Sequence, residues 1–327
     1  MELSCPRCAS TLPQTSAGSI PCTGCGAQWP VVAGIPDLRV HPDPYIALDE
    51  DREKAERLAR EGEGLSPAAL VDLYFSLTPE VPPGLASGYR RGMLELGPAR
   101  AEDRLERLQH DVPRFGQSPR VLDLGCGAGA WLPSLGARAG ELVGVDVALR
   151  WLVVARAVLR ARGIEATLIC GNAESLPLSR NSFDVVIAAN VLEHARDAEA
   201  SLNEVFRVLD KDGYAYIATP NRFSVLPEPH VGVPGLGLLP RAAADEIVRR
   251  ALGVPYGGIT LRGSLGWTDL ATSAGFRRVQ TRAPVPGRRE RDLLSRPGRL
   301  AARALAATAG NPVGRGALRA LGPMLEV

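Results

Sequence analysis

A carboxylate followed by three alternating glycines marks a place where a small charged ligand could lie. The segment Val121-Leu-Asp123-Leu-Gly125-Cys-Gly127-Ala-Gly129 runs from an apolar stretch into glycines and then into a helical pattern. Glycine lets the backbone turn sharply and lets a ligand approach it closely, and the N-terminus of a following helix favours an anionic group such as a carboxylate. The segment therefore predicts a ligand-binding loop at the end of a strand.

Two kinds of ligand fit this loop, a dinucleotide and a donor with an amino-acid end. Gly125, Gly127 and Ala130 satisfy the dinucleotide spacing G-x-G-x-x-G/A. Asp123 lies two residues before the first glycine, where its carboxylate would repel a pyrophosphate but attract the ammonium of a methionine moiety. Asp146 ends the next strand, Leu-Val-Gly-Val-Asp, where it can accept both ribose hydroxyls of either ligand. The loop leaves both ligands open, and Asp123 favours the methionine donor.

Later segments, taken in their order along the chain, resemble a known family. They read Cys-Gly-Asn-Ala-Glu at 170–174, Phe-Asp-Val-Val-Ile-Ala-Ala-Asn-Val-Leu-Glu-His at 183–194 and Val-Leu-Asp-Lys-Asp-Gly-Tyr-Ala-Tyr-Ile-Ala-Thr-Pro-Asn-Arg at 208–222. Together with the glycine loop they resemble class I S-adenosylmethionine-dependent methyltransferases over roughly residues 119–282. The Leu-Glu-His segment resembles the quinone and natural-product methyltransferases more than the enzymes that modify bases.

The resemblance implies a fold, a cofactor and residue roles. The implied fold is a doubly wound α/β fold with a mostly parallel, seven-stranded sheet, and the implied cofactor is S-adenosylmethionine. The methionine part would rest on Asp123, Gly125, Gly127 and Gly129. Asp146, with Val147 beside it, would take the ribose. Asn172 and Ala173 would border the adenine, and Asn190 would lie near the sulfonium.

The chemistry of methyl transfer points to further residues. The reaction is an in-line displacement for which the protein mainly supplies alignment, with a general base where the acceptor is a hydroxyl. His194 is the candidate catalytic base because it follows the fourth core strand; the alternative is a histidine that only caps a helix or packs. His230 is a second candidate, and Glu193 and Asn221 could orient an acceptor. No Asn-Pro-Pro-Tyr and no cysteine follow that strand, which disfavours an exocyclic base-amine methyltransferase and a cysteine-adduct mechanism.

Four cysteines near the N-terminus have the spacing of a metal site. Cys5 and Cys8, then Cys22 and Cys25, form two Cys-x-x-Cys pairs separated by thirteen residues, as in tetrahedral zinc sites. Residues 3–38 resemble the zinc ribbon of bacterial rRNA guanine methyltransferases and of methyltransferase activator subunits. The resemblance implies a structural zinc, since four thiolates leave no open position for catalysis. Four reduced thiols without metal, or a redox pair, are the alternatives.

The elements that must position these residues alternate between strand and helix after Pro119, which predicts a parallel sheet with right-handed crossovers. Ligands bind such sheets at the carboxyl ends of the strands. Strands are expected at 120–124, 142–146, 166–170, 183–189, 214–219 and 276–282, and the last residues, 322–327, can form an antiparallel strand. Helices are expected at 49–60, 65–77, 88–110, 131–139, 150–162, 198–209 and 267–274.

The predicted organisation has four parts: a zinc ribbon over residues 1–40, a linker with N-terminal helices over 41–118, the methyltransferase core over 119–285 and a basic helical tail over 286–327. A Pro- and Gly-rich insertion at 223–261 is expected to form a lid, as long insertions often carry function. The tail holds eight arginines and three acidic residues. Such a tail indicates contact with phosphate, as in RNA, a nucleotide sugar or a lipid head group, or simply a solvated face.

Composition limits the class of protein. The chain has 327 residues, of which 45% are hydrophobic, enough for one large domain and a small accessory one. No apolar run reaches the ~18 residues that a membrane span needs, and the N-terminus lacks the regions of a signal peptide. A cytoplasmic protein without disulfides is therefore expected. The net charge of +2 and the 5% aromatic content count against RNA binding.

Three functions remain in competition. The leading one is methyl transfer from S-adenosylmethionine to an O, N or C nucleophile of a small or lipid-linked metabolite. The second is an rRNA or tRNA methyltransferase that uses the zinc ribbon for docking. The third is a non-catalytic subunit that only binds the cofactor. Nothing in the sequence reports the oligomeric state.

Overall fold

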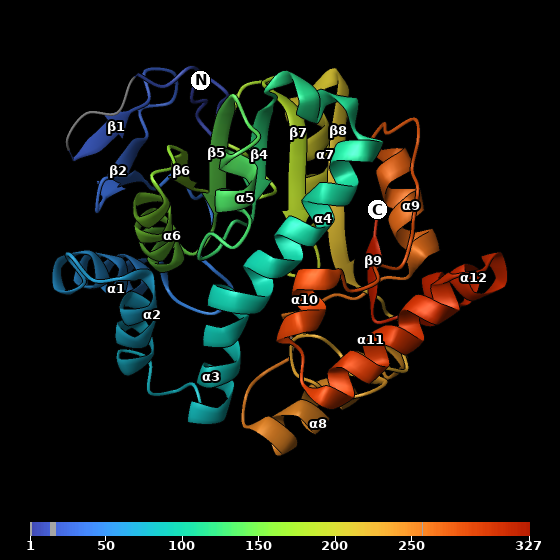
Figure 1. Ribbon diagram of the computed structural model, residues 1–327. Coiled ribbons are helices and arrows are strands. Elements are labelled where there is room, and N and C mark those ends of the chain that lie inside the picture. Colours follow the sequence, from blue (N-terminus) through green and yellow to red (C-terminus); the bar gives the residue numbers. More distant parts are fainter. Residues whose placement is uncertain (1, 14–17, 257) are drawn as a thin grey trace. The chain divides into compact units, whose positions relative to one another are not determined.

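The computed structural model describes residues 2–13, 18–256 and 258–327 and contains two compact units (Figure 1). The first unit comprises the chain up to Ile187 together with Arg207–Tyr214, and the second comprises Ala188–Phe206 and Ala215–Val327. The large sheet has the strand order β6-β5-β4-β7-β8-β9. Its strands are β4 (Arg120–Leu124), β5 (Glu141–Asp146), β6 (Thr167–Cys170), β7 (Phe183–Ala189), β8 (Leu209–Pro220) and β9 (Met324–Glu326).

The sheet is mostly parallel, as expected, but it has six strands rather than the seven predicted. Strand β4 pairs in parallel with β5, and β5 with β6, whereas β9 runs antiparallel to β8. Residues 276–282, expected to form a strand, make one antiparallel bridge, from Arg282 to Glu326. Because β9 has only three residues, its outer edge offers too few backbone groups for a longer ladder.

The first unit carries the N-terminal helices and the helices that follow β4 and β5. They are α1 (Leu48–Glu61), α2 (Pro67–Ser76), α3 (Pro83–Arg91), α4 (Gly97–Asp111), α5 (Leu132–Gly136) and α6 (Leu149–Arg162). Helices α1 and α2 pack against α6, and α4 packs against α5 (Figure 1). Most residues of the strands between them are apolar and buried, as is typical of parallel strands covered on both faces.

A single long helix was expected over 88–110, but a π-helical turn at Gly92–Leu96 separates α3 from α4. The N–H of Gly97 bonds to the carbonyl of Gly92, one residue further back than in an α-helix. Pro98 comes next and has no N–H to donate, so the regular ladder cannot continue through this point. The glycines at both ends of the turn lower the helix propensity further.

The ribbon is a three-stranded antiparallel sheet of β1 (Ser19–Pro21), β2 (Gln28–Val32) and β3 (Ile35–Pro36). Its exit segment continues along the edge of β6, where Asp37 forms a parallel bridge to Cys170 and the Leu38 N–H donates to the Cys170 carbonyl at 2.8 Å. The start of the chain adds a bridge from Leu3 to Leu178. The ribbon thereby covers a strand edge that would otherwise be open to pairing.

A buried ion network joins the ribbon exit to the carboxyl end of β5. Arg39 has no exposed side-chain surface and donates to both carboxylate oxygens of Asp37, each at 2.8 Å. Its third nitrogen donates to Asp51 at 2.6 Å and to the Val147 carbonyl at 2.9 Å. Burial opposes ionisation of Asp37, but Arg39 and Arg52 outweigh it and lower the pKa of this carboxyl.

Asp51 of α1 completes the network at the start of α6. Ala148, the residue before α6, offers no side-chain cap. Asp51 takes that role, because it accepts from the Leu149 N–H at 3.0 Å and from the Arg150 guanidinium at 2.8 Å. Capping of the first free N–H groups of a helix stabilises it, so α1 holds α6 in place through a fully buried carboxylate.

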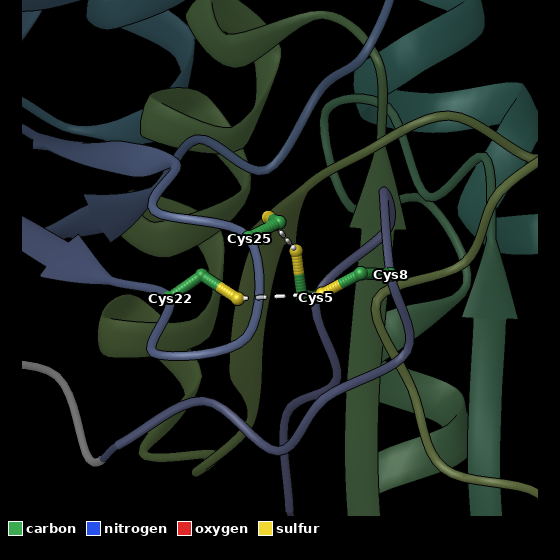
Figure 2. Close-up of side chains that lie close together, drawn as sticks. All are labelled: Cys5, Cys8, Cys22 and Cys25. Atoms are coloured by element: carbon green, nitrogen blue, oxygen red, sulfur yellow. Dashed lines mark hydrogen bonds between the residues drawn. The ribbon is translucent and has the colours of Figure 1, made fainter.

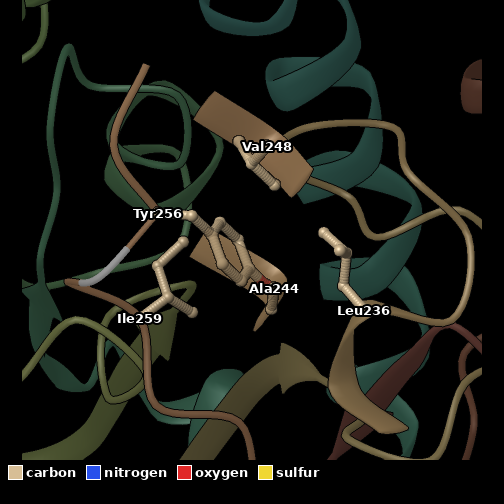
Figure 3. Close-up of a cluster of buried hydrophobic side chains, with 5 residues drawn as sticks. All are labelled: Leu236, Ala244, Val248, Tyr256 and Ile259. Atoms are coloured by element: carbon tan, nitrogen blue, oxygen red, sulfur yellow. The ribbon is translucent and has the colours of Figure 1, made fainter. Parts of the chain in front are cut away.

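The second unit carries α7 (Ala198–Val208), α8 (Arg241–Leu252), α9 (Ser264–Ser273), α10 (Arg288–Leu293), α11 (Arg296–Ala309) and α12 (Pro312–Leu321). The insertion after β8 has a small hydrophobic core of its own (Figure 3), formed by Leu236, Ala244, Val248, Tyr256 and Ile259. Asp245 of α8 accepts a hydrogen bond from the Tyr256 N–H at 2.7 Å and so links the helix to the segment that follows it. Among the described residues, no helix is both long and apolar enough to cross a bilayer.

The ion network makes a prediction about stability. Asp51→Asn leaves two buried guanidinium groups short of negative charge, and breaking a buried pair in this way costs about 3 kcal/mol or more. Asp49→Asn is the matched control, since Asp49 lies on the same helix with 97% of its side chain exposed and should change stability by less than about 0.5 kcal/mol. Urea unfolding of both variants measures the difference. Equal losses would contradict the structural role of Asp51.

Candidate functional site

The glycine loop that follows β4 is shaped by positive backbone angles. Gly125, Gly127 and Gly129 have φ values of 68°, 50° and 84°, a region that favours glycine. A Cβ on Gly127 would meet no atom within 4 Å, whereas one on Gly129 would lie 3.2 Å from the Cα of Ala155 in α6. Gly129 therefore permits close packing of the loop on α6, and Gly127 leaves open space in front of the loop.

Asp123 is a buried carboxylate that lacks a partner. It is 1% exposed, and its Oδ2 atom has no hydrogen bond. Burial, and then the neighbouring charge of Asp146, raise the pKa of Asp123 well above its usual value. A buried charge is costly unless it is paired. An ammonium group beside Oδ2 would supply that pairing, so the chemistry of this position fits the amino-acid end of a cationic donor.

Asp146 is held at the end of β5 by two backbone amides. Its Oδ2 accepts from the Gly127 N–H and its Oδ1 from the Ala148 N–H, both at 2.7 Å. Burial raises the pKa of Asp146 to about 6, although these two amides oppose the shift. Each carboxylate oxygen keeps a further acceptor position, so the pair can still accept the two hydroxyls of a ribose.

Asn172 lies at the end of β6, but its side chain faces the linker. Its Oδ1 accepts from the N–H groups of Val40 at 2.8 Å and His41 at 3.1 Å, and its Nδ2 donates to the His41 carbonyl at 3.2 Å. Both the oxygen and the nitrogen of the amide group thus bond to the backbone of residues 40–41. Ala173 beside it is half-buried, and the Val147 carbonyl receives the hydrogen bond from Arg39.

The four N-terminal cysteines converge, as Figure 2 shows. All four sulfur atoms lie within 4.8 Å of one another, and two pairs are closer, Cys5 to Cys25 at 3.7 Å and Cys8 to Cys22 at 3.5 Å. A zinc ion bound tetrahedrally at ~2.3 Å sets its sulfurs about 3.8 Å apart, so the four thiols fit this ion. Gly24 is needed here because a Cβ would lie 2.1 Å from the Ser10 hydroxyl oxygen.

A second group of titratable side chains lies in the second unit. Nε2 of His194 and Nε2 of His230 are 3.1 Å apart, and a carboxylate oxygen of the fully buried Glu193 is 3.7 Å from His230 Nε2. On the other side of its ring, His230 Nδ1 contacts Glu228 at 2.7 Å. Glu228 is fixed in turn by the N–H groups of His230 and Val231.

The pKa values of the two histidines are shifted in opposite directions. Burial, and then the neighbouring His230, lower the pKa of His194 to about 3. Burial also opposes protonation of His230, but Glu228 and Glu193 outweigh it and raise its pKa. The surroundings therefore shift the pKa values of the two rings in opposite directions. Burial raises the pKa of Glu193 to about 7, although His230 opposes the shift.

The same atoms could instead hold a divalent cation. One ligand atom from each of Glu193, His194 and His230 lies within 4.8 Å of the others. A carboxylate on the far nitrogen of a ligating histidine fixes its tautomer, and Glu228 has this position on His230. The group can thus either pass a proton along Glu228, His230 and His194 or bind a metal through the two rings and Glu193.

Asn190, expected near the sulfonium, and Asn221, expected near the acceptor, both bond to the backbone. Asn190 follows β7 in the left-handed region, with φ of 59°, and its N–H donates to the Ala218 carbonyl at 2.7 Å. Asn221 is 2% exposed and donates from its side chain to the Ala320 carbonyl at 3.0 Å. Because the side chain of Asn221 also accepts from the Phe223 N–H, it is committed to the fold rather than offered to an acceptor.

Residues 122–217 match a family model described as "Methyltransferase domain". This segment is therefore similar to methyltransferase domains. Its relatives include the "Ubiquinone biosynthesis O-methyltransferase" of Azorhizobium caulinodans, 34% identical over 103 residues that cover 32% of this chain and 41% of the relative. An "Uncharacterized methyltransferase" of Bacillus subtilis is 36% identical over 95 residues, which cover 29% and 38% of the two chains. The match thus spans less than half the length of either relative.

A solved S-adenosylmethionine-dependent methyltransferase from Mesorhizobium loti is similar to the chain with a TM-score of 0.47 and 19% identity, covering 69% of this chain and 96% of that one. The matched segment contains the glycine loop, Asp146, Asn172, Glu193 and His194, and it reaches neither the ribbon nor residues 39–41 nor Glu228. Sequence reasoning predicted the ribbon but missed residues 39–41 and Glu228. The spacing Glu-Pro-His at 228–230 could have suggested a carboxylate–histidine pair.

Glu193 makes a prediction about pH. A carboxyl group whose pKa is raised by folding loses stability as pH rises from its unfolded value near 4.5 to its folded value, here about 7. Glu193→Gln removes this loss, so the variant should exceed the parent in unfolding free energy at pH 8 by on the order of 2 to 3 kcal/mol and match it at pH 4. Urea titrations at both pH values measure the difference. Glu199→Gln, an exposed control, should show no such pH dependence; a parallel offset for Glu193→Gln at both pH values would refute the argument.

Proposed function

We propose that this protein transfers a methyl group from S-adenosylmethionine to a hydroxyl of a small or lipid-linked metabolite. The observation that carries the proposal is the buried, unpartnered oxygen of Asp123 beside the open space at Gly127. A dinucleotide would bring a pyrophosphate to this point, where a second negative charge would be repelled. A methionine ammonium would instead neutralise the carboxylate.

The donor would be held by the ends of three neighbouring strands. Asp123 would bind the ammonium, the loop from Gly125 to Gly129 would cradle the amino-acid end, and Asp146 would accept the ribose hydroxyls. Val147 and Ala173 would lie along the adenosine, and Asn190 is proposed near the sulfur. The cofactor, when bound, supplies a methyl group on a cationic sulfur, so the protein needs to contribute mainly position and a destination for the acceptor proton.

The group formed by His194, His230, Glu193 and Glu228 would accept the proton that the acceptor loses. His194 is proposed as the residue that faces the acceptor hydroxyl, with His230 and Glu228 behind it to take up the proton. A hydroxyl acceptor is favoured because a relay of this kind serves a group that must lose a proton as the bond forms. The O-methyltransferase name of the Azorhizobium caulinodans relative is consistent with this class of acceptor.

The direct test follows radiolabelled methyl groups from S-adenosylmethionine into an extracted metabolite pool and, separately, into total RNA. Label in a metabolite fraction is the expected result. Label in RNA alone would replace the metabolite with the rRNA or tRNA acceptor. Cofactor binding without label in either fraction would leave the chain as a non-catalytic subunit.

Gly127 makes a prediction about donor binding. Gly127→Ala should weaken binding of S-adenosylhomocysteine at least tenfold, because the new methyl group would occupy the space in front of the loop. Gly163→Ala is the matched control: it has a similar φ of 63°, ends α6 and likewise faces open space. Both variants should lose about 1 kcal/mol of stability from backbone strain. Calorimetric titration separates the two effects, and equal affinities of the two variants would count against the site.

Glu228 makes a prediction about the pH profile. Since Glu228 raises the pKa of His230, Glu228→Gln should move the rising limb of kcat towards lower pH while its plateau falls by about 10²-fold. A limb that stays in place would exclude His230 as part of the relay. Glu246→Gln on α8 serves as the control, because 41% of the Glu246 side chain is exposed and it lies outside this group. If a chelator instead abolishes activity while the four cysteines keep their zinc and S-adenosylhomocysteine still binds, and a divalent cation restores it, Glu193, His194 and His230 act as metal ligands rather than as a relay.

A further inference from the structure

We propose that residues 39–41 form the adenosine-side wall of the donor site, and that the zinc ribbon holds this wall in place, so that loss of zinc from the ribbon weakens donor binding. The inference rests on the proposed donor site and adds a second domain to it. Every contact that carries it lies within the first compact unit.

The first step is the side chain of Asn172. This residue follows β6 at the proposed adenine end, yet all its polar atoms bond to the backbone of Val40 and His41. Asn172 is 3% exposed, so these bonds are shielded from water and correspondingly costly to break. The surface near adenine is therefore made in part by the linker rather than by the Asn172 side chain.

The second step is Arg39, which reaches the proposed ribose end. Its guanidinium donates to the Val147 carbonyl at 2.9 Å. Val147 stands between Asp146, the proposed ribose acceptor, and Ala148, whose N–H orients that carboxylate at 2.7 Å. A shift of Arg39 would leave a buried carbonyl without its donor and would loosen the turn that aims Asp146.

The third step links this wall to the ribbon. The Asp37 N–H donates to the Pro30 carbonyl of β2 at 2.8 Å, so Asp37 belongs to the ribbon sheet. Both carboxylate oxygens of Asp37 also accept hydrogen bonds from Arg39. Leu38, between them, donates its N–H to Cys170 at the end of β6. The ribbon, the wall and the strand end are thus joined within three consecutive residues.

The fourth step is the dependence of the ribbon on its metal. Its apolar core is small, and besides Cys5, Cys22 and Pro36 the buried apolar side chains that the structure describes there are Leu12, Ile20, Trp29, Val32, Ile35 and Leu38. A piece of this size rarely folds on its core alone, and in small zinc domains the energy of metal binding is folding energy. Loss of zinc would free β2, remove the Pro30 partner of Asp37 and let Arg39 and residues 40–41 move.

The coupling must act in both directions. If zinc tightens donor binding by some factor, the donor tightens zinc binding by the same factor, because the two affinities are linked through one equilibrium. The position of the wall also makes the effect specific, since only the adenosine half of the donor touches it. Adenosine alone should therefore show the same dependence on zinc as the whole donor.

The test uses the full chain, first loaded with zinc and then stripped with a chelator. We expect S-adenosylhomocysteine and adenosine to bind about tenfold more weakly after stripping, with recovery on return of zinc. In competition with a chromogenic chelator, S-adenosylhomocysteine should raise the affinity for zinc by the same factor. Equal donor affinity with and without zinc, or a chain that binds no zinc, would overturn the inference. No binding to the zinc-loaded chain would instead refute the proposed donor site itself.

Two variants keep the test valid if stripping unfolds the protein. Arg39→Lys keeps the charge but loses the fork that holds Asp37 and Val147 together, and Asn172→Ala releases residues 40–41. Both should retain zinc and lose about tenfold in adenosine affinity. Arg52→Lys is the control, because Arg52 also binds Asp37 at 2.7 Å but makes no bond to residues 146–148 in the structure. Adenosine affinities equal to that of Arg52→Lys would contradict the wall.

Discussion

The arrangement of the first unit depends on carboxylates that parallel strands deliver to one edge of a sheet. Asp123 and Asp146 end neighbouring strands, and burial raises the pKa of both. Asp146 is compensated by backbone amides, whereas one oxygen of Asp123 is not. A hydrogen-bond donor or a cation beside that oxygen would lower this cost. The ammonium group of the proposed sulfonium donor is both, which is why Asp123 favours that proposal over a dinucleotide.

A second buried network contains positive charges, and these are neutralised by carboxylates. Arg39 and Arg150 bring two guanidinium charges beneath the same strand ends, and Asp37, Asp43 and Asp51 neutralise them. Apolar residues in place of such a network could stabilise a protein equally well. Its use therefore lies in geometry, because a guanidinium fork fixes the directions of its partners. Here it ties the ribbon exit, α1 and the start of α6 to the turn that bears Asp146.

The sequence predicts those parts of the molecule whose signals are local. The glycine loop, the apolar strands and the paired cysteines each depend on residues close together in the chain, and all are found where expected. The π-turn before Pro98 and the missing strand at 276–282 depend on backbone pairing, which sequence patterns report poorly. Asn172 shows the limit most clearly, since its role depends on residues 131 and 132 positions away that no local pattern connects to it.

The two histidines show why a catalytic group must be judged with its neighbours. His194, the base expected from the sequence, has its pKa lowered to about 3, so alone it would accept a proton poorly. At its partner His230 burial opposes protonation, but Glu228 and Glu193 outweigh it and raise the pKa. Burial also raises the pKa of Glu193 to about 7. Groups this close titrate as one unit, so the base proposed here is the whole group rather than His194 alone.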